Sequence, residues 1–159
     1  MPTSFTIRNA LVAAVQSVTV AAGYNTDINP DNVFDTVDAL QGQQQTDAAN
    51  AYPKVYVFSE GAKYSDLPSY RIHKVETFSV VAVFSAATVL PGQVMDLSNQ
   101  VSGWIDDLEI MIVSQKQAGG ADAWRIAMVA DDLGANQTEA VVVAEIHCEY
   151  KRNLRIPGS

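Results

Sequence analysis

Apolar and polar residues recur along the chain with two periods, and these periods predict its elements. Residues 91–113 have the clearest helical period, because apolar side chains there recur at steps of three and four. That stripe consists of Val94, Leu97, Val101, Trp104, Ile105, Leu108, Met111 and Ile112. A first helix is predicted after a cap at Thr3 or Ser4, with Gly23 as its stop. Its apolar stripe consists of Ile7, Leu11, Ala14, Val15, Val18 and Ala22.

Alternating residues predict strands over 54–58, 70–84, 124–130 and 138–150, with a short strand within 33–40. Both faces are apolar near the end of 70–84, which indicates a central strand covered on both sides, and we expect the two helices to be those covers. The order α-(β)-β-β-α-β-β predicts an α+β fold with a mostly antiparallel four- to five-stranded sheet and two main helices. We expect a single domain over residues 1–152 and a flexible tail over 153–159.

Several surface features have no evident role in the core of one chain. Residues 110–113 are apolar all round the helix, so either a loop of the same chain or another subunit is expected to cover them. Gly103 lies inside the predicted helix, where glycine is unfavourable. Either a neighbouring backbone approaches closely there, or the glycine is a neutral substitution that the helix tolerates. Loops are predicted at 41–51, 61–69 and 115–121, and the Gln-rich 41–51 is either a plain linker or a contact loop. The candidate interface residues are Gly103, Ile110, Val113, Gln43, Gln44, Gln45, Lys63 and Tyr64.

The charge balance narrows the classes of partner. Ten Lys and Arg residues face 18 Asp and Glu residues, which gives a formal net charge of −8. Proteins that read nucleic acid neutralise phosphates with clustered Lys and Arg, and the basic cluster here is limited to Lys151, Arg152 and Arg155. A nucleic-acid reader is therefore disfavoured. Cys148 is the single cysteine, which excludes an internal disulfide, and no apolar run approaches the roughly 20 residues of a membrane span.

The residue types of catalysis and metal binding do not converge in this sequence. His147 and Cys148 are neighbours on a strand and so point to opposite faces, and we expect Cys148 to be a buried, inert thiol. Acidic residues in 27–38 match a calcium loop poorly, which favours an ordinary polar loop. The pairs Asp106-Asp107 and Asp131-Asp132 are expected to be solvated surface. We therefore expect no catalytic residue, no metal site and no cofactor, and a protein that is not an enzyme.

A series of segments follows one another along the chain, each matching one predicted element or turn. They are FTIRNALVAAV, YPKVYVF, ETFSVVAVF, VMDLSNQVSGWIDDLEIMI, AGGADAWRI and EAVVVAEIHCEYK. In its order and spacing this series resembles the tail terminator proteins of long-tailed bacteriophages, also described as tail completion or minor tail protein U-like proteins. The resemblance covers nearly the full length, apart from the Gln-rich loop and the tail after Lys151.

The resemblance implies a virion protein of the viral tail that forms a hexameric ring on the head-proximal end of the tail tube. Such a ring stops tube polymerisation and presents the head-joining surface. The implied partners are copies of itself, the tail tube protein and the head–tail connector protein, with genome DNA passing through without specific binding, and no membrane. From the acidic balance we hypothesise that the lumen of the ring is acidic, which would let DNA slide through without sticking. Two alternatives stay open: another head–tail connector or tail-tube component, and a small-molecule-binding or enzymatic α+β domain.

Overall fold

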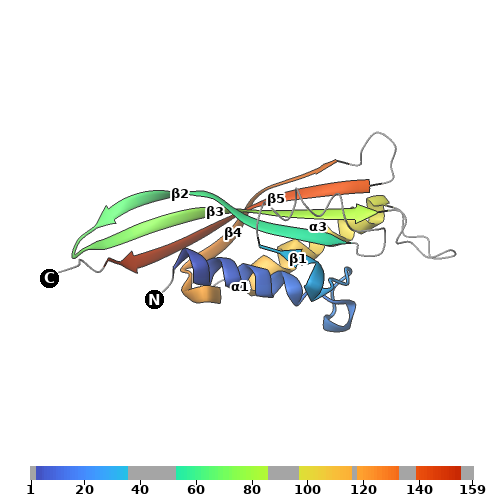
Figure 1. Cartoon of the computed structure of the whole chain (residues 1–159), viewed down its shortest axis with the longest axis horizontal. Coiled ribbons are helices and arrows are strands. Elements are labelled where there is room, and N and C mark those ends of the chain that lie inside the picture. Colours follow the sequence, from blue (N-terminus) through green and yellow to red (C-terminus); the bar gives the residue numbers. More distant parts are fainter. Residues whose placement is uncertain (1–2, 36–52, 86–96, 116–117, 133–138, 155–159) are drawn as a thin grey trace.

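The structure, a computed structural model, describes residues 3–35, 53–85, 97–115, 118–132 and 139–154. Its elements follow one another in the predicted order (Figure 1). The helices are α1 (Ser4–Gln16) and α3 (Leu97–Ser114), with short 3₁₀ turns η1 (Val20–Ala22), η2 (Pro30–Asn32) and η4 (Ala118–Gly120). The strands are β1 (Val33–Phe34), β2 (Lys54–Leu67), β3 (Arg71–Ser85), β4 (Ala123–Asp132) and β5 (Glu139–Asn153).

One five-stranded sheet, in the order β1-β2-β3-β5-β4, forms one layer of the molecule. The four long strands are antiparallel to their neighbours, whereas β1 runs parallel to β2 through the pairs Val33–Val55 and Phe34–Tyr56. The α+β prediction is confirmed, and the sheet is mixed rather than purely antiparallel because of β1. β3 is central as predicted, since β2 and β5 flank it on its two sides.

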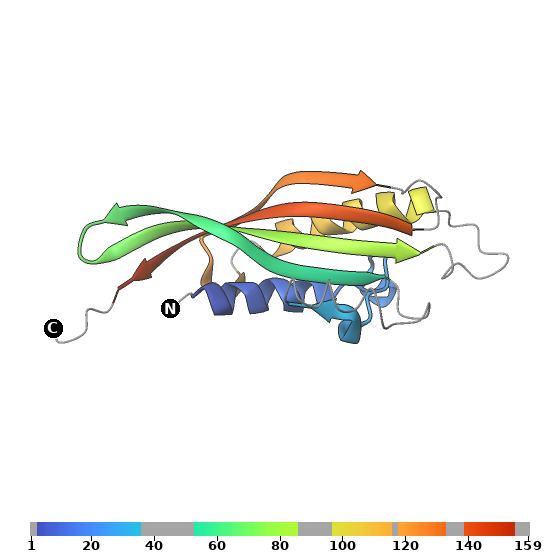
Figure 2. The same cartoon turned by 45° about the horizontal axis from the view of Figure 1, so that its top comes forward.

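Both helices pack on the same face of the sheet (Figure 2). Four strands at a spacing of about 4.8 Å present roughly 19 Å of width, which accommodates two helices of about 10 Å each. The opposite face has its own buried cluster of Tyr56, Val81 and Val83, where Phe34 stacks on Tyr56 at a centroid distance of 5.2 Å. Both faces of β3 are thus buried, as predicted. The expectation that each helix covers a different face is wrong, because the apolar stripes of both helices meet one continuous core.

α1 begins at the predicted cap and ends earlier than predicted. The Thr3 side chain accepts a hydrogen bond from the backbone N–H of Thr6, and the Thr6 hydroxyl accepts one from the N–H of Thr3. The helix ends at Gln16, after which the Ser17 hydroxyl donates to a backbone carbonyl of the last turn at 2.6 Å and competes with helical pairing. Gly23, with φ of +98°, caps the separate turn η1 instead of α1.

β2 continues well past the segment that alternation predicted. Residues 61–69 were expected in a loop, but β2 runs to Leu67 and only a short turn separates it from β3. The strand is bulged between Ser59 and Gly61, whose φ of +122° suits glycine alone. The residues after the bulge are mostly polar and exposed, so the apolar alternation that marks a half-buried strand is absent there.

An arm of three strands projects beyond the helices. It comprises residues 61–77, which hold the end of β2, the turn and the start of β3, and residues 149–154, which hold the end of β5 and Leu154. The arm extends past the N-terminal end of α1 (Figures 1 and 2). β5 pairs with β3 as far as Asn153, and the N–H of Leu154 donates to the carbonyl of Tyr70 at 2.7 Å. The sheet therefore reaches past residue 152, where we expected the domain to end.

Candidate subunit interface

The last turns of α3 divide their apolar residues between the core and solvent. Met111 and Ile112 are buried, whereas Ile110 and Val113 are 56% and 63% exposed. Single exposed apolar residues are ordinary on protein surfaces, but residues three apart on a helix are neighbours and form one patch. As predicted, the apolar residues at this end of the helix exceed what one core stripe needs. We call Ile110 and Val113 the α3 pair.

Gly103 and Asp107 face a loop of the same chain. A Cβ placed on Gly103 would lie 3.1 Å from the Cβ of Asn25, so the close approach at this glycine is made within the chain. Asp107 is fully buried, and it accepts hydrogen bonds from the backbone N–H groups of Asn25 and Thr26 at 2.9 and 2.8 Å. The expectation that Asp107 is solvated surface is wrong, because this carboxylate ties the loop to α3, whereas Asp106 is exposed. A contact of Gly103 with another subunit stays a prediction.

The other candidate contact residues do not gather with the α3 pair. Lys63 and Tyr64 lie on the arm, in β2 rather than in a loop. Both are exposed, and the Lys74 ammonium group lies 5.4 Å from the centroid of the Tyr64 ring, within reach of a cation–π contact. Gln43, Gln44 and Gln45 lie outside the described residues. Their contacts with another subunit or with a tail tube therefore stay predictions.

The predicted flexible turn at 115–121 packs against α1 in its described part. Gly119 has φ of +70°, and a Cβ there would lie 3.1 Å from the carbonyl oxygen of Thr6 and 3.2 Å from the Cα of Ile7. The indole Nε1 of Trp124 donates to the carbonyl of Ala118 at 3.1 Å and holds this turn to the start of β4. Residues 118–121 therefore pack against α1 within the chain. A contact of this turn with another subunit or with a tail tube stays a prediction.

A polar cluster around the buried Glu76, at the root of the arm, was not predicted. Its members come from α1, β2, β3 and β5, and we call it the Glu76 cluster: Ser4, Ser59, Lys74, Glu76 and Tyr150. Ser4 and Ser59 donate to Glu76 Oε2 at 2.6 and 2.7 Å, and Tyr150 donates to Oε1 at 2.8 Å. Lys74 Nζ lies 3.4 Å from the same Oε1. A signal existed in the sequence, since Lys74 and Glu76 alternate with Phe78 on the core-facing side of their strand.

The Glu76 cluster holds a carboxylate and an ammonium group in their charged forms. Burial opposes the charge on Glu76, but the three hydroxyl hydrogen bonds and the charge of Lys74 outweigh it, so the pKa of Glu76 is lowered. Burial also opposes the charge on Lys74, but Tyr150 and Glu76 outweigh it and the pKa of Lys74 is raised. Burial raises the pKa of Tyr150 to about 12. The cluster is therefore a satisfied structural network, in which no group is poised to exchange a proton near neutral pH.

Cys148 is fully buried, as predicted, and lies across from Glu76 in the pairing of β3 with β5. Burial, together with the nearby charges of Glu76, Asp122 and Glu149, raises the pKa of its thiol to about 12. A thiol with such a pKa stays protonated near neutral pH and is a poor nucleophile.

The two histidines lie on the face of the sheet away from the helices, each beside a carboxylate. His73 Nε2 lies 2.6 Å from Glu149 Oε1, and His147 Nε2 lies 2.9 Å from Glu145 Oε1. Arg125 approaches the second oxygen of Glu149 at 4.0 Å. Among the described residues, no group of three or more His, Cys, Asp or Glu side chains is arranged to hold a metal ion. These pairs form a charged surface on β3, β5 and β4.

Comparisons with known proteins do not assign the chain to a family. No protein-family model matches the chain, and no curated protein sequence matches it. Within the described ranges, no helix has the length and apolar character needed to cross a membrane. The features available for a functional proposal are therefore the fold, the α3 pair, the arm and the edges of the sheet.

Proposed function

We propose that the protein is a structural ring protein of the virion, a tail terminator that caps the head-proximal end of a bacteriophage tail tube. The observation that carries the proposal is the α3 pair, because Ile110 and Val113 remain more than half exposed in the single chain. Another copy that covers them removes apolar surface from water and so favours association. The order and spacing of the segments that resemble tail terminators support the specific assignment.

The α3 pair contributes a modest part of the free energy of association. Full burial of an aliphatic side chain is worth about 1.5–3 kcal/mol, and somewhat over half of each member remains to be covered, so the pair supplies about 2–3.5 kcal/mol per contact. Stable interfaces between proteins bury surfaces of about 800 Å² on each partner. A ring therefore needs further contacts beside the α3 pair.

Addition of the purified protein to purified tails tests the function. A tail terminator binds one end of each tail and is visible there as a cap by electron microscopy. Binding along the tail, or no binding, contradicts the proposal. Indefinite tubes formed by the protein alone favour a tail-tube component instead.

A substitution at the α3 pair tests the carrying observation. Ile110→Asp places a charge in the proposed contact, and we expect it to abolish assembly at tail ends while the monomer keeps its circular dichroism spectrum and its urea midpoint. Val20→Asp is the matched control, because Val20 is exposed to a similar extent, 58% against 56%, and belongs to η1 and not to α3. An Ile110→Asp monomer that unfolds, or equal loss of assembly in both variants, contradicts a specific role for the α3 pair.

A further inference from the structure

The two outer long strands of the sheet, β2 and β4, run in opposite directions. The pairings of β2 with β3, of β3 with β5 and of β5 with β4 are all antiparallel, so the direction reverses three times across the sheet. A second copy placed beside the first in the same orientation therefore brings its β2 alongside the first copy's β4 as an antiparallel neighbour. Beyond the two residues of β2 that pair with β1, the four-strand pattern then continues across the boundary.

Both of these edges are open over much of their length. β1 pairs with β2 at Val55 and Tyr56, and in the part of the chain that the structure describes no strand pairs with β2 beyond them or with the outer side of β4. Unpaired backbone N–H and C=O groups along an edge are a template for a strand of another chain. Each edge carries a bulge, at Glu60 in β2 and at Ala127 in β4, and both bulges adjoin the row of Ile146 in β5. Bulges discourage indiscriminate pairing, so a partner must match the irregularity.

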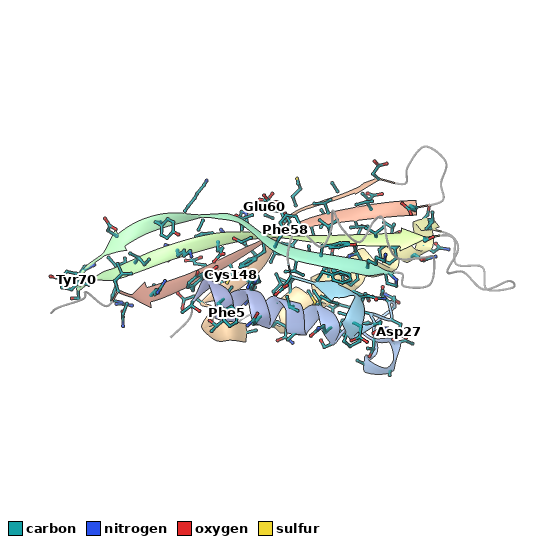
Figure 3. All side chains as sticks on the ribbon, in the orientation of Figure 1. Phe5, Asp27, Phe58, Glu60, Tyr70 and Cys148 are labelled. Atoms are coloured by element: carbon teal, nitrogen blue, oxygen red, sulfur yellow. The ribbon has the colours of Figure 1, made fainter. Side chains whose placement is uncertain are left out.

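Side chains on the two edges are complementary when the rows of the sheet are carried straight across. Arg125 of β4 shares a row with Gly61 of β2, next to the bulge residue Glu60, and Met128 shares a row with Phe58. Glu60 and Arg125 are exposed and of opposite charge, and Met128 is 51% exposed. Figure 3 shows Phe58 and Glu60 on the face of the sheet away from α1. An edge-to-edge contact thus joins a charged pair and an apolar pair on one face.

We propose that copies of this chain join edge to edge, with residues 123–128 on the outer edge of β4 in one copy pairing with residues 58–63 of β2 in the next. The inference rests on the proposed function, because a tail terminator forms a closed ring and these edge contacts would build such a ring. Because each copy uses two different edges, the contact is head-to-tail and either closes into a ring or continues. The same boundary brings the helical layers together, since α3 packs beside β4 and α1 beside β2. Strand pairing supplies the contact area that the α3 pair lacks.

Cysteine cross-linking tests the contact, in the presence and absence of purified tails. Glu60→Cys and Arg125→Cys each add one exposed thiol, and the native Cys148 is fully buried and stays out of the reaction. Within one chain the two positions are three strand spacings apart, about 14 Å. A disulfide requires Cα atoms within about 7 Å, so these cysteines can be joined only between copies. We expect no disulfide dimer from either single variant, dimers from their mixture, and a ladder of oligomers from the double variant.

The pattern of products separates this contact from other arrangements. Dimers from a single variant alone indicate that like edges meet, and no dimer from the mixture indicates that these edges do not meet; either result overturns the inference. Asn9→Cys on the exposed side of α1, mixed with Arg125→Cys, is the matched control and should give no dimer. Tail-end binding by the unmodified protein is scored separately. Binding without cross-linking overturns the edge contact alone, and cross-linking without binding overturns the tail terminator function alone.

Discussion

Replacing Glu76 by Gln tests whether the Glu76 cluster stabilises the fold through charge. Gln has nearly the same volume, and the surrounding hydroxyls can rotate to meet its amide, so the main loss is the negative charge 3.4 Å from Lys74 Nζ. Removing one partner of a buried ion pair costs about 3–5 kcal/mol. The Lys74 side chain keeps 11% exposure, so we expect the lower end of that range, about 3 kcal/mol in the free energy of unfolding.

The pH dependence of that loss distinguishes charge from packing. The pKa of Glu76 is lowered by folding from its ordinary 4.5, so its contribution is present above that value and is lost as the pH falls through the folded-state pKa. Urea unfolding at a series of pH values should therefore show a large difference between the wild type and Glu76→Gln near neutral pH, and a difference that shrinks at acidic pH. A difference that does not change with pH refutes the reasoning, as does a variant as stable as the wild type.

A double variant serves as the internal control. Lys74→Met combined with Glu76→Leu removes both charges, and because no unpaired ion remains it should recover more than half of the stability lost in Glu76→Gln. If the double variant is no better than the single one, the hydroxyl hydrogen bonds rather than the ion pair carry the stability.

Two further predictions concern single buried groups. Asp107→Ala leaves the backbone N–H groups of Asn25 and Thr26 without their acceptor, and it should lower the free energy of unfolding by about 2–4 kcal/mol. Asp106→Ala, at the exposed neighbouring position, should change that free energy by less than about 0.5 kcal/mol. Equal effects of the two substitutions in urea denaturation contradict the buried role of Asp107. Cys148 should react with a thiol reagent only after urea unfolding, because its side chain is buried and burial raises the pKa of its thiol to about 12, and rapid labelling of the native protein contradicts this.

The elements that the sequence predicts well are those whose pattern is local. The alternation in β5 places Ala144, Ile146 and Cys148 on one face, and all three are fully buried there. The extension of β2 to Leu67 has no such pattern, since its strand character comes from pairing with β3 and not from its own residues. The sequence also could not reveal that both helices pack on the same face of the sheet, because each apolar stripe shows only that its helix is covered and not which face covers it.

Buried polar residues were missed for a different reason. Asp107 lies three residues after Trp104 and four before Met111, so it occupies the core stripe of α3, but its charge favoured a solvent-facing interpretation. Glu76 likewise lies in the core-facing row of β3. A charged residue at a core position is tolerated only with hydrogen-bond or ionic partners, and here those partners come from distant parts of the chain. They are residues 25–26 for Asp107, and Ser4, Ser59 and Tyr150 for Glu76.

The place of the Glu76 cluster gives it a role in the proposed assembly. A ring closes only if the two contact surfaces of each copy are held at a fixed angle. In the proposed contact those surfaces are the two edges of one sheet, and the bulges at Glu60 and Ala127 increase the local twist between them. Glu76 ties α1 to β2, β3 and β5 beside the bulge of β2, where the sheet leaves the helices and becomes the arm. A satisfied polar network at that point limits bending of the arm against the body, which suits the proposed ring subunit, because its two edges must keep a fixed angle.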